Sequence, residues 1–199
     1  SFESINIYNN SILLRTTETN TTGDYNISFI SPSTSGSYTI EVNTTYNSLN
    51  SNQSAILTVD ASLPVVTLLR PSNTGWANAS NLTFFFNATE TNPDTCTIYG
   101  NFSNSFTANT TLPNYVSNAL SNITVNKTLA ERNYTWNILC NDTTSNQAFA
   151  LSNFTFTLDL TQPTSIRSVS PGNGTVSANL TPLFNWTNTT ESFFLNYTL

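Results

Sequence analysis

The chain has 199 residues, of which 38% are hydrophobic, 12% are aromatic and only 8% are charged, and its net charge is −6. This apolar content excludes a disordered chain, and five basic residues without a basic patch exclude a nucleic-acid partner. No apolar run approaches twenty residues and no signal peptide is present, so we expect no membrane span in this chain.

Short runs that alternate polar and apolar residues recur along the chain, with Gly, Pro and Asn between them and no sustained helical periodicity. In the middle of the chain they predict strands near 64–70, 81–89, 95–100, 121–127, 133–140 and 152–159, and a weaker strand near 102–108. About seven strands in some 100 residues are typical of an immunoglobulin-like sandwich. We therefore predict an all-β fold of tandem immunoglobulin-like β-sandwich modules.

An internal repeat sets the domain organisation. The segment ILTVDASLP (56–64) matches TFTLDLTQP (155–163), and NLTFFFNAT (81–89) matches NLTPLFNWT (179–187). NISF with Tyr38 repeats as NITV with Tyr134, and RPSNTG (70–75) stands beside SPGNGT (170–175). These pairs lie 96 to 100 residues apart, which predicts modules of about 99 residues.

Only one copy of this repeat is complete, at residues 61–160. Residues 1–60 resemble the C-terminal strands of a preceding module, and residues 161–199 resemble the N-terminal strands of the next. The two fragments together have the length of one module, so we predict that a neighbouring copy completes it. Three explanations fit this arrangement. The 199 residues are a polymer subunit, or they are one translational unit of a long covalent array, or the boundaries of the sequence fall there by accident. The chain begins at Ser1 and lacks Met, so we expect a processed product or a piece of something longer.

Acceptor sequons for N-linked sugar occur at 20 positions, about twice the roughly nine that random placement of 31 Asn and 60 Ser and Thr would give. Some sequons lie inside predicted strands, where Asn and Ser or Thr face outward while the residue between them faces the core. The candidates are Asn9, Asn20, Asn26, Asn43, Asn52, Asn78, Asn81, Asn87, Asn101, Asn109, Asn122, Asn126, Asn133, Asn141, Asn153, Asn173, Asn179, Asn185, Asn188 and Asn196. Pro182 makes Asn179 a poor acceptor.

The two cysteines, Cys96 and Cys140, are predicted to form one disulfide in an oxidising, extracellular setting, with two free buried thiols as the alternative.

The segments NYTWNILCND (133–142) and DTCTIY (94–99) resemble the tandem Ig-like modules of archaeal cell-surface glycoproteins and extracellular filament subunits. The resemblance covers residues 61–160, with weaker echoes in both partial modules, and it implies an extracellular structural role. One departure concerns the disulfide. The position of Cys96 aligns near Phe194 and that of Cys140 near Thr44, so the shared module is expected to lack the bridge.

Catalytic chemistry finds little support in the sequence. The chain has no His, only six Gly and no phosphate-binding loop, and its acidic residues are spread singly, so we predict that it is not an enzyme and needs no cofactor besides covalent glycans.

Asp60 and Asp159, one at each module junction, are the candidate positions for a calcium site. Neither shows clustered carboxylates in sequence, so capping of a turn is favoured over a calcium site and no metal ligand is assigned. Trp136 is predicted to lie in the core. Trp76 is expected to cover the end of the core rather than to stack on sugar.

Together these features predict a structural subunit of an extracellular, heavily N-glycosylated filament or surface array. Copies would join head to tail by sharing β-strands, as a homopolymer at the cell surface. The first alternative is a fragment of a long single-chain adhesin or cell-surface stalk. The second is a carbohydrate-binding β-sandwich, which predicts an exposed row of aromatic residues on one sheet face.

Overall fold

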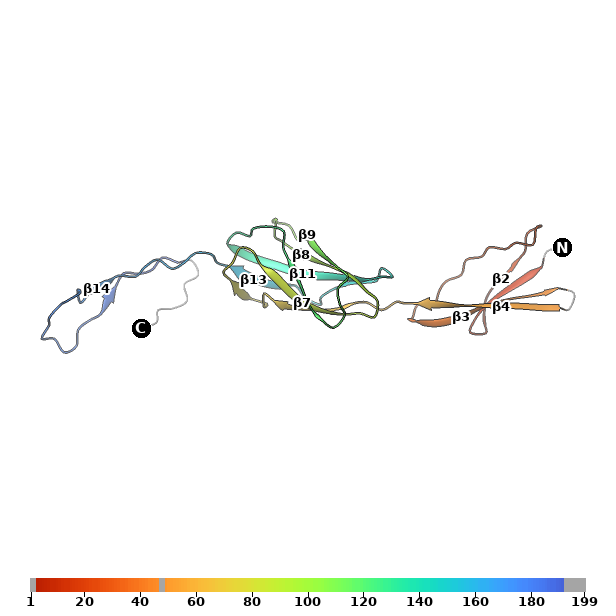
Figure 1. Ribbon diagram of the computed structural model, residues 1–199, viewed down its shortest axis with the longest axis horizontal. Coiled ribbons are helices and arrows are strands. Elements are labelled where there is room, and N and C mark those ends of the chain that lie inside the picture. The colour runs from red at the N-terminus through yellow and green to blue at the C-terminus, as the bar shows by residue number, and fades with distance from the viewer. Residues whose placement is uncertain (1–2, 47–48, 192–199) are drawn as a thin grey trace.

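A computed structural model describes residues 3–46 and 49–191, and these ranges contain strands and irregular segments but no helix. Nothing in the described ranges has the length and apolar character of a membrane-spanning helix. Figure 1 shows an elongated molecule with a sandwich at its centre, a four-stranded sheet near the N-terminus and the strand pair β14–β15 near the C-terminus. The prediction of an all-β fold of tandem sandwich modules is confirmed.

The central module consists of two sheets. The smaller sheet has the strand order β10–β7–β5, formed by β5 (Val65–Arg70), β7 (Thr83–Thr89) and β10 (Leu120–Thr124). The larger sheet has the order β6–β13–β11–β8–β9, with β12 also paired to β11. Its strands are β6 (Gly75–Ala77), β8 (Pro93–Gly100), β9 (Thr107–Pro113), β11 (Arg132–Asp142), β12 (Gln147–Phe149) and β13 (Phe154–Leu158).

The core of this module lies between the two sheets, where every second residue of each strand points inward. Phe84 on β7 is fully buried, and its ring packs edge-on against Phe102, Trp136 and Phe156 at centroid separations of 5.5, 4.9 and 5.8 Å. These aromatic contacts join residues from both sheets, so the hydrophobic effect and the ring geometry both hold the sandwich closed.

The N-terminal sheet repeats the larger sheet of the central module. It has the order β2–β1–β3–β4, with β1 (Ser4–Asn9), β2 (Ile12–Glu18), β3 (Gly36–Tyr46) and β4 (Leu49–Val59). Strand β3 lies 96 residues before β11 and has the same length of 11 residues. Tyr38 pairs with Leu57 in the same register in which Tyr134 pairs with Phe156. The length of this strand and its register with the next strand are therefore the same in the two copies of the repeat.

A tyrosine corner marks the start of both β3 and β11. The Tyr134 hydroxyl donates to the Ala130 carbonyl at 2.8 Å, and the Tyr38 hydroxyl donates to the Thr34 carbonyl at 2.9 Å. This bond, from a strand tyrosine to the backbone a few residues upstream, is a hallmark of immunoglobulin-like sandwiches.

The C-terminal pair, β14 (Ser168–Ser170) and β15 (Asn185–Trp186), repeats β5 and β7. Along the first strand of each pair the register shifts at equivalent residues, between Leu68 and Arg70 and between Ser168 and Ser170. The partner residues differ, because Leu68 pairs with Phe86 whereas Ser168 pairs with Trp186, two residues beyond the equivalent Phe184. The following turns also match, because the amide of Gly75 donates to the carbonyl of Ser72 at 3.0 Å and the amide of Thr175 donates to that of Gly172 at 3.0 Å.

The prediction of a strand near 102–108 is wrong. Residues 101–106 turn back on themselves, with Asn104 at a φ of 78° and its amide bonded to the carbonyl of Asn101 at 3.0 Å, and the strand that follows is β9. Phe102 is buried inside this turn rather than along a strand. The short strands β6 and β12 were not predicted.

Candidate functional site

The N-terminal sheet has no second sheet against its inner face in the described part of the chain. Tyr38, Ile40 and Val42 on β3 are only half-buried, whereas their three equivalents on β11 are buried. Ile5 and Ile7 on β1 are buried, so the sheet already has the beginning of a core. The remainder of this inner face is open.

In the C-terminal strand pair, apolar residues whose equivalents are buried in the central module are exposed. Phe184 is 68% exposed, while its equivalent Phe86 in the central module is 0% exposed. Ile166 is 53% exposed, while its equivalent Val66 is 8% exposed. These apolar side chains belong to the smaller type of sheet, and in residues 3–46 and 49–191 no sheet of the larger type packs on them.

A third segment lacks its partner strand. Residues 24–28 are the equivalent, 96 residues earlier, of β10, which in the central module pairs with β7. In the N-terminal part no strand equivalent to β7 is present among the described residues, and 24–28 forms no strand. The strand equivalent to β7 is β15, at the other end of the molecule (Figure 1). Each end therefore carries elements that the other end lacks.

The described sequon asparagines all lie at the surface, and none of them is buried. The exposed ones are Asn20, Asn26, Asn52, Asn78, Asn81, Asn109, Asn122, Asn126, Asn133, Asn153, Asn173, Asn179, Asn185 and Asn188. The half-buried ones are Asn9, Asn43, Asn87, Asn101 and Asn141. Asn196 lies outside the described residues.

Asn141 differs from the other sequon positions in its contacts. Its amide nitrogen, the atom that a glycan would occupy, donates to the Asp94 carboxylate at 3.1 Å, and its amide oxygen accepts a bond from Thr95. Glycosylation there would have to compete with the bond from the amide nitrogen. At exposed positions such as Asn109, Asn133 and Asn153 only the amide oxygen is bonded, as an acceptor.

The two cysteines form a disulfide between neighbouring strands, with Cys96 on β8 opposite Cys140 on β11. In the N-terminal sheet the same places are taken by Ile5 and Thr44, which pair across β1 and β3. Thr44 therefore stands where Cys140 does, as expected. Ile5, rather than Phe194, faces it in this chain; Phe194 lies outside the described residues.

The two tryptophans of the central module differ in their surroundings. Trp136 is 0% exposed, as predicted. Trp76 is 61% exposed, so the expectation that it covers the core is wrong. It lies on β6, at the edge of the larger sheet, and lines a groove with the linker residues 159–163.

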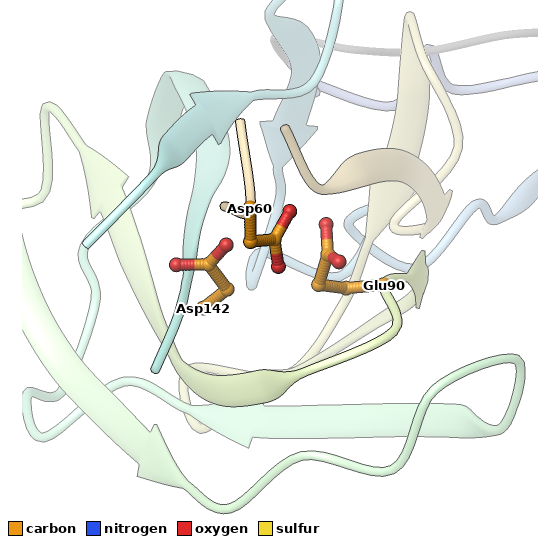
Figure 2. A group of neighbouring side chains, drawn as sticks. All are labelled: Asp60, Glu90 and Asp142. Carbon is orange, nitrogen blue, oxygen red and sulfur yellow. The ribbon is translucent and has the colours of Figure 1, made fainter. Parts of the chain in front are cut away.

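Three carboxylates meet at the junction between the N-terminal sheet and the central module. Asp60 belongs to the linker after β4, Glu90 follows β7 and Asp142 ends β11, and one oxygen of each lies within 4.8 Å of the others. Figure 2 shows the three side chains turned toward one another. The sequence did not predict this cluster, because its members are 30 and 52 residues apart and only the fold brings them together.

Polar contacts tie this junction together. The Asn92 amide donates to the Asp60 carboxylate at 2.7 Å, and the Asn146 amide donates both to the Asp60 carbonyl at 3.1 Å and to the Asp142 carboxylate at 2.8 Å. Hydrogen bonds from Ser62 and then Asn92 lower the pKa of Asp60. Burial raises the pKa of Asp142, but the bonds from Asn146 and Thr144 outweigh it, and the pKa lies below its ordinary value.

A buried phenol lies beside the same carboxylates. Tyr115 is 3% exposed, and its hydroxyl has no hydrogen-bond partner among the described residues. Burial, followed by the charges of Glu90 and Asp142, raises the pKa of Tyr115 to about 12.

The second junction, between the central module and the C-terminal pair, is built differently. Glu131 accepts bonds from the Leu160 amide at 2.6 Å and the Thr161 hydroxyl at 2.5 Å, and the Thr161 bond is the first cause of its lowered pKa. The Asp159 amide donates to the Ala77 carbonyl at 2.9 Å. Asp159 thus occupies the place of Asp60 without belonging to a carboxylate cluster among the described residues.

Comparisons with known proteins found weak structural likeness and no related family. No model of a known protein family matches it, and no curated protein matches it. Among solved structures, a likeness was found to "Crystal structure of tetra-tandem repeat in extending region of large adhesion protein", with 16% sequence identity and a TM-score of 0.39. The alignment covers 84% of this chain and 45% of that chain, so this chain spans less than half of that protein.

Proposed function

We propose that the chain is a structural subunit of an extracellular, heavily N-glycosylated filament or surface array, in which neighbouring copies complete each other's modules. One observation carries this proposal: the open halves at the two ends are complementary. The N-terminal end presents the larger sheet, the C-terminal end presents strands of the smaller sheet, and they lie on opposite sides of the central module (Figure 1).

Assembly would bury the apolar side chains that are exposed at both ends. Phe184 and Ile166 of one copy would pack against the inner face of β3 and β4 of the next, as Phe86 and Val66 pack in the central module. Each such side chain contributes about 1.5–3 kcal/mol when it is fully buried. Residues 24–28 would gain β15 as a partner and form a strand, because exposed edges recruit strands through backbone hydrogen bonds.

Surface chemistry supports an extracellular setting for such an array. The disulfide requires an oxidising environment, and the many exposed sequons would place polar glycans on a surface that has few charges. We expect these glycans to maintain solubility and to block unwanted pairing of sheet edges.

The assembly is tested with Phe184→Asp, which places a charge at the centre of the proposed shared core. We expect this variant to form no filaments in negative-stain micrographs, while wild type forms them. Leu151→Asp is the matched control, because Leu151 is 102% exposed on the central module and takes no part in either open half. Filaments of Phe184→Asp as long as those of wild type would refute the shared core.

The main alternative is that the copies are joined covalently in a long adhesin or cell-surface stalk, in which the same halves pair within one chain. Denaturing electrophoresis after deglycosylation separates the two. A discrete band near 21.8 kDa supports separate subunits, and a very large band supports the stalk.

A carbohydrate-binding role has one observation in its favour. On the outer face of the larger sheet, the Tyr99 ring contacts those of Phe106 and Phe149, at centroid separations of 6.2 and 5.0 Å. Phe106 and Phe149 are 41% and 42% exposed, and the sequon residue Asn153 borders the groove that they line. Oligosaccharide binding that is lost in Phe149→Ala would favour this role over a structural one.

A further inference from the structure

The junction cluster concentrates negative charge without a balancing cation. Glu90 and Asp142 are 7% and 1% exposed, and Asp60 adds a third carboxylate within 4.8 Å. No Lys or Arg in the described part of the chain pairs with any of the three. Carboxylates that are buried this closely repel one another, so a cation bound among them would be favoured.

The Tyr115 hydroxyl gives an independent indication of a missing ligand. The turn that carries it folds onto the cluster, since the Tyr115 amide donates to the Asp94 carbonyl at 3.2 Å and the Glu90 amide donates to the Ser117 hydroxyl at 2.9 Å. Although the hydroxyl is buried in the field of Glu90 and Asp142, it bonds to neither. A buried polar atom without a partner is costly, and a ligand at the carboxylates, or a water molecule bound to it, would satisfy it.

The available ligand atoms are oxygens. Besides the carboxylates, the amide groups of Asn92 and Asn146 touch Asp60 and Asp142, and a half-turn of either amide would present its oxygen to the cluster. Ca²⁺ takes six to eight oxygen ligands in flexible geometry, which suits a site assembled from a linker and two strand ends. Zn²⁺ does not fit, because the chain has no His and both cysteines are in the disulfide.

We propose that Asp60, Glu90 and Asp142 bind one Ca²⁺ ion, which fastens the linker of the N-terminal sheet to the central module. The expectation of no metal ligand rested on the spacing of acidic residues in the sequence, which hid this cluster. The site lies within one chain and does not depend on the proposed assembly. Asp159, Asn188 and Tyr46 hold the equivalent sequence positions of the repeat, so only one junction in each copy carries the three acids.

Calorimetric titration of the full, deglycosylated chain with CaCl₂, after treatment with EDTA and in 0.15 M NaCl, tests the site. We expect one ion per chain, with a dissociation constant of about 10⁻⁴–10⁻³ M, the range of extracellular modules. Saturating Ca²⁺ should also raise the melting temperature of the chain by several degrees. Absence of binding at 10 mM Ca²⁺ would overturn the proposal.

Two variants and a matched control locate the ion. Glu90→Gln and Asp142→Asn keep the shape of the side chain and should each weaken binding at least tenfold. Asp159→Asn removes the equivalent carboxylate at the other junction and should bind as wild type does. Should Asp142→Asn fail to fold, Glu90→Gln decides. Unchanged affinity in Glu90→Gln assigns the ion to other surface carboxylates and refutes the site.

Discussion

The central module and the N-terminal sheet share one strand architecture but differ in how far it is buried. Both have the tyrosine corner, the 11-residue strand and the same register between paired strands. The inner residues of β11 are buried by the smaller sheet, whereas those of β3 are half-buried. The first 60 residues are thus enough for these strands to pair with one another. Burial of their inner side chains, as seen in the central module, requires strands from outside this stretch of sequence. Equivalent substitutions in the two regions measure this difference.

The largest difference is expected for Trp136→Ala against Ile40→Ala, at equivalent positions of the two sheets. Trp136 fills the closed core, so its truncation should lower the free energy of unfolding of the central module by about 3–5 kcal/mol. Ile40 faces an open surface in the single chain, and its truncation should cost less than about 1 kcal/mol.

Urea denaturation of the isolated chain measures both losses. In assembled material the cost of Ile40→Ala should rise, because the neighbouring copy would bury the side chain. Equal losses for the two variants in the isolated chain would mean that the N-terminal sheet already has a closed core.

Removal of the disulfide is expected to have the next largest effect. Cys96 and Cys140 are 44 residues apart in the sequence of the central module, and a Cys96→Ala/Cys140→Ala variant should lose about 2–4 kcal/mol of stability. The N-terminal sheet has Ile5 and Thr44 at these places, so dithiothreitol should leave its unfolding unchanged. Thermal melts with and without reductant, followed by hydrogen exchange of each region, test this, and protection lost equally from both sheets would contradict it.

The parts of the fold that the sequence predicts are those with a local signal. Alternation along β7 and β11 places Phe84 and Trp136 in the core, and the 96–100-residue repeat reveals one complete and two partial modules. The errors have tertiary causes. The turn at 101–106 depends on a hydrogen bond from the Asn101 amide to the carbonyl of Thr135, which lies on a strand far away in the sequence. The alternation of polar and apolar residues does not reveal this bond.

The same reasoning explains why the acidic junction was missed. Asp60, Glu90 and Asp142 lie far apart in the sequence, and nothing near any of them indicates a cluster. Their proximity follows from strand order, since β7 and β11 end on the side of the module that the linker enters. Trp76 was misplaced for a related reason: its strand β6 lies at a sheet edge, and an edge position cannot be recognised from residue type.

A smaller difference is expected for the two tyrosine corners. Tyr134→Phe removes a bond to the Ala130 carbonyl and another from the Ala130 amide, and it should cost about 1–2 kcal/mol in the central module. Tyr38→Phe also removes two bonds, one to the Thr34 carbonyl and one with the Thr34 hydroxyl, but in a more exposed setting where water can replace them, so its cost should be about half as large. Paired urea titrations measure the difference, and a larger loss for Tyr38 would reverse the assignment of the closed module.

The smallest effect is a shift in the pH dependence of stability through Asp142. Hydrogen bonds hold its pKa below the ordinary value of 3.8, so its charged form stabilises the fold above that pH, and this contribution is lost as the pH falls through the lower folded-state pKa. Asn146→Ala removes a donor and lets burial dominate, so the pKa should rise and stability should begin to fall at a higher pH. We expect a change of no more than about 1 kcal/mol between pH 5 and pH 3, measured by urea titration in EDTA. Asn146→Ala also removes a contact with the linker, which can lower stability at every pH without changing the shape of the curve. If stability depends on pH as it does in wild type, the backbone amides and Thr144 alone keep Asp142 charged.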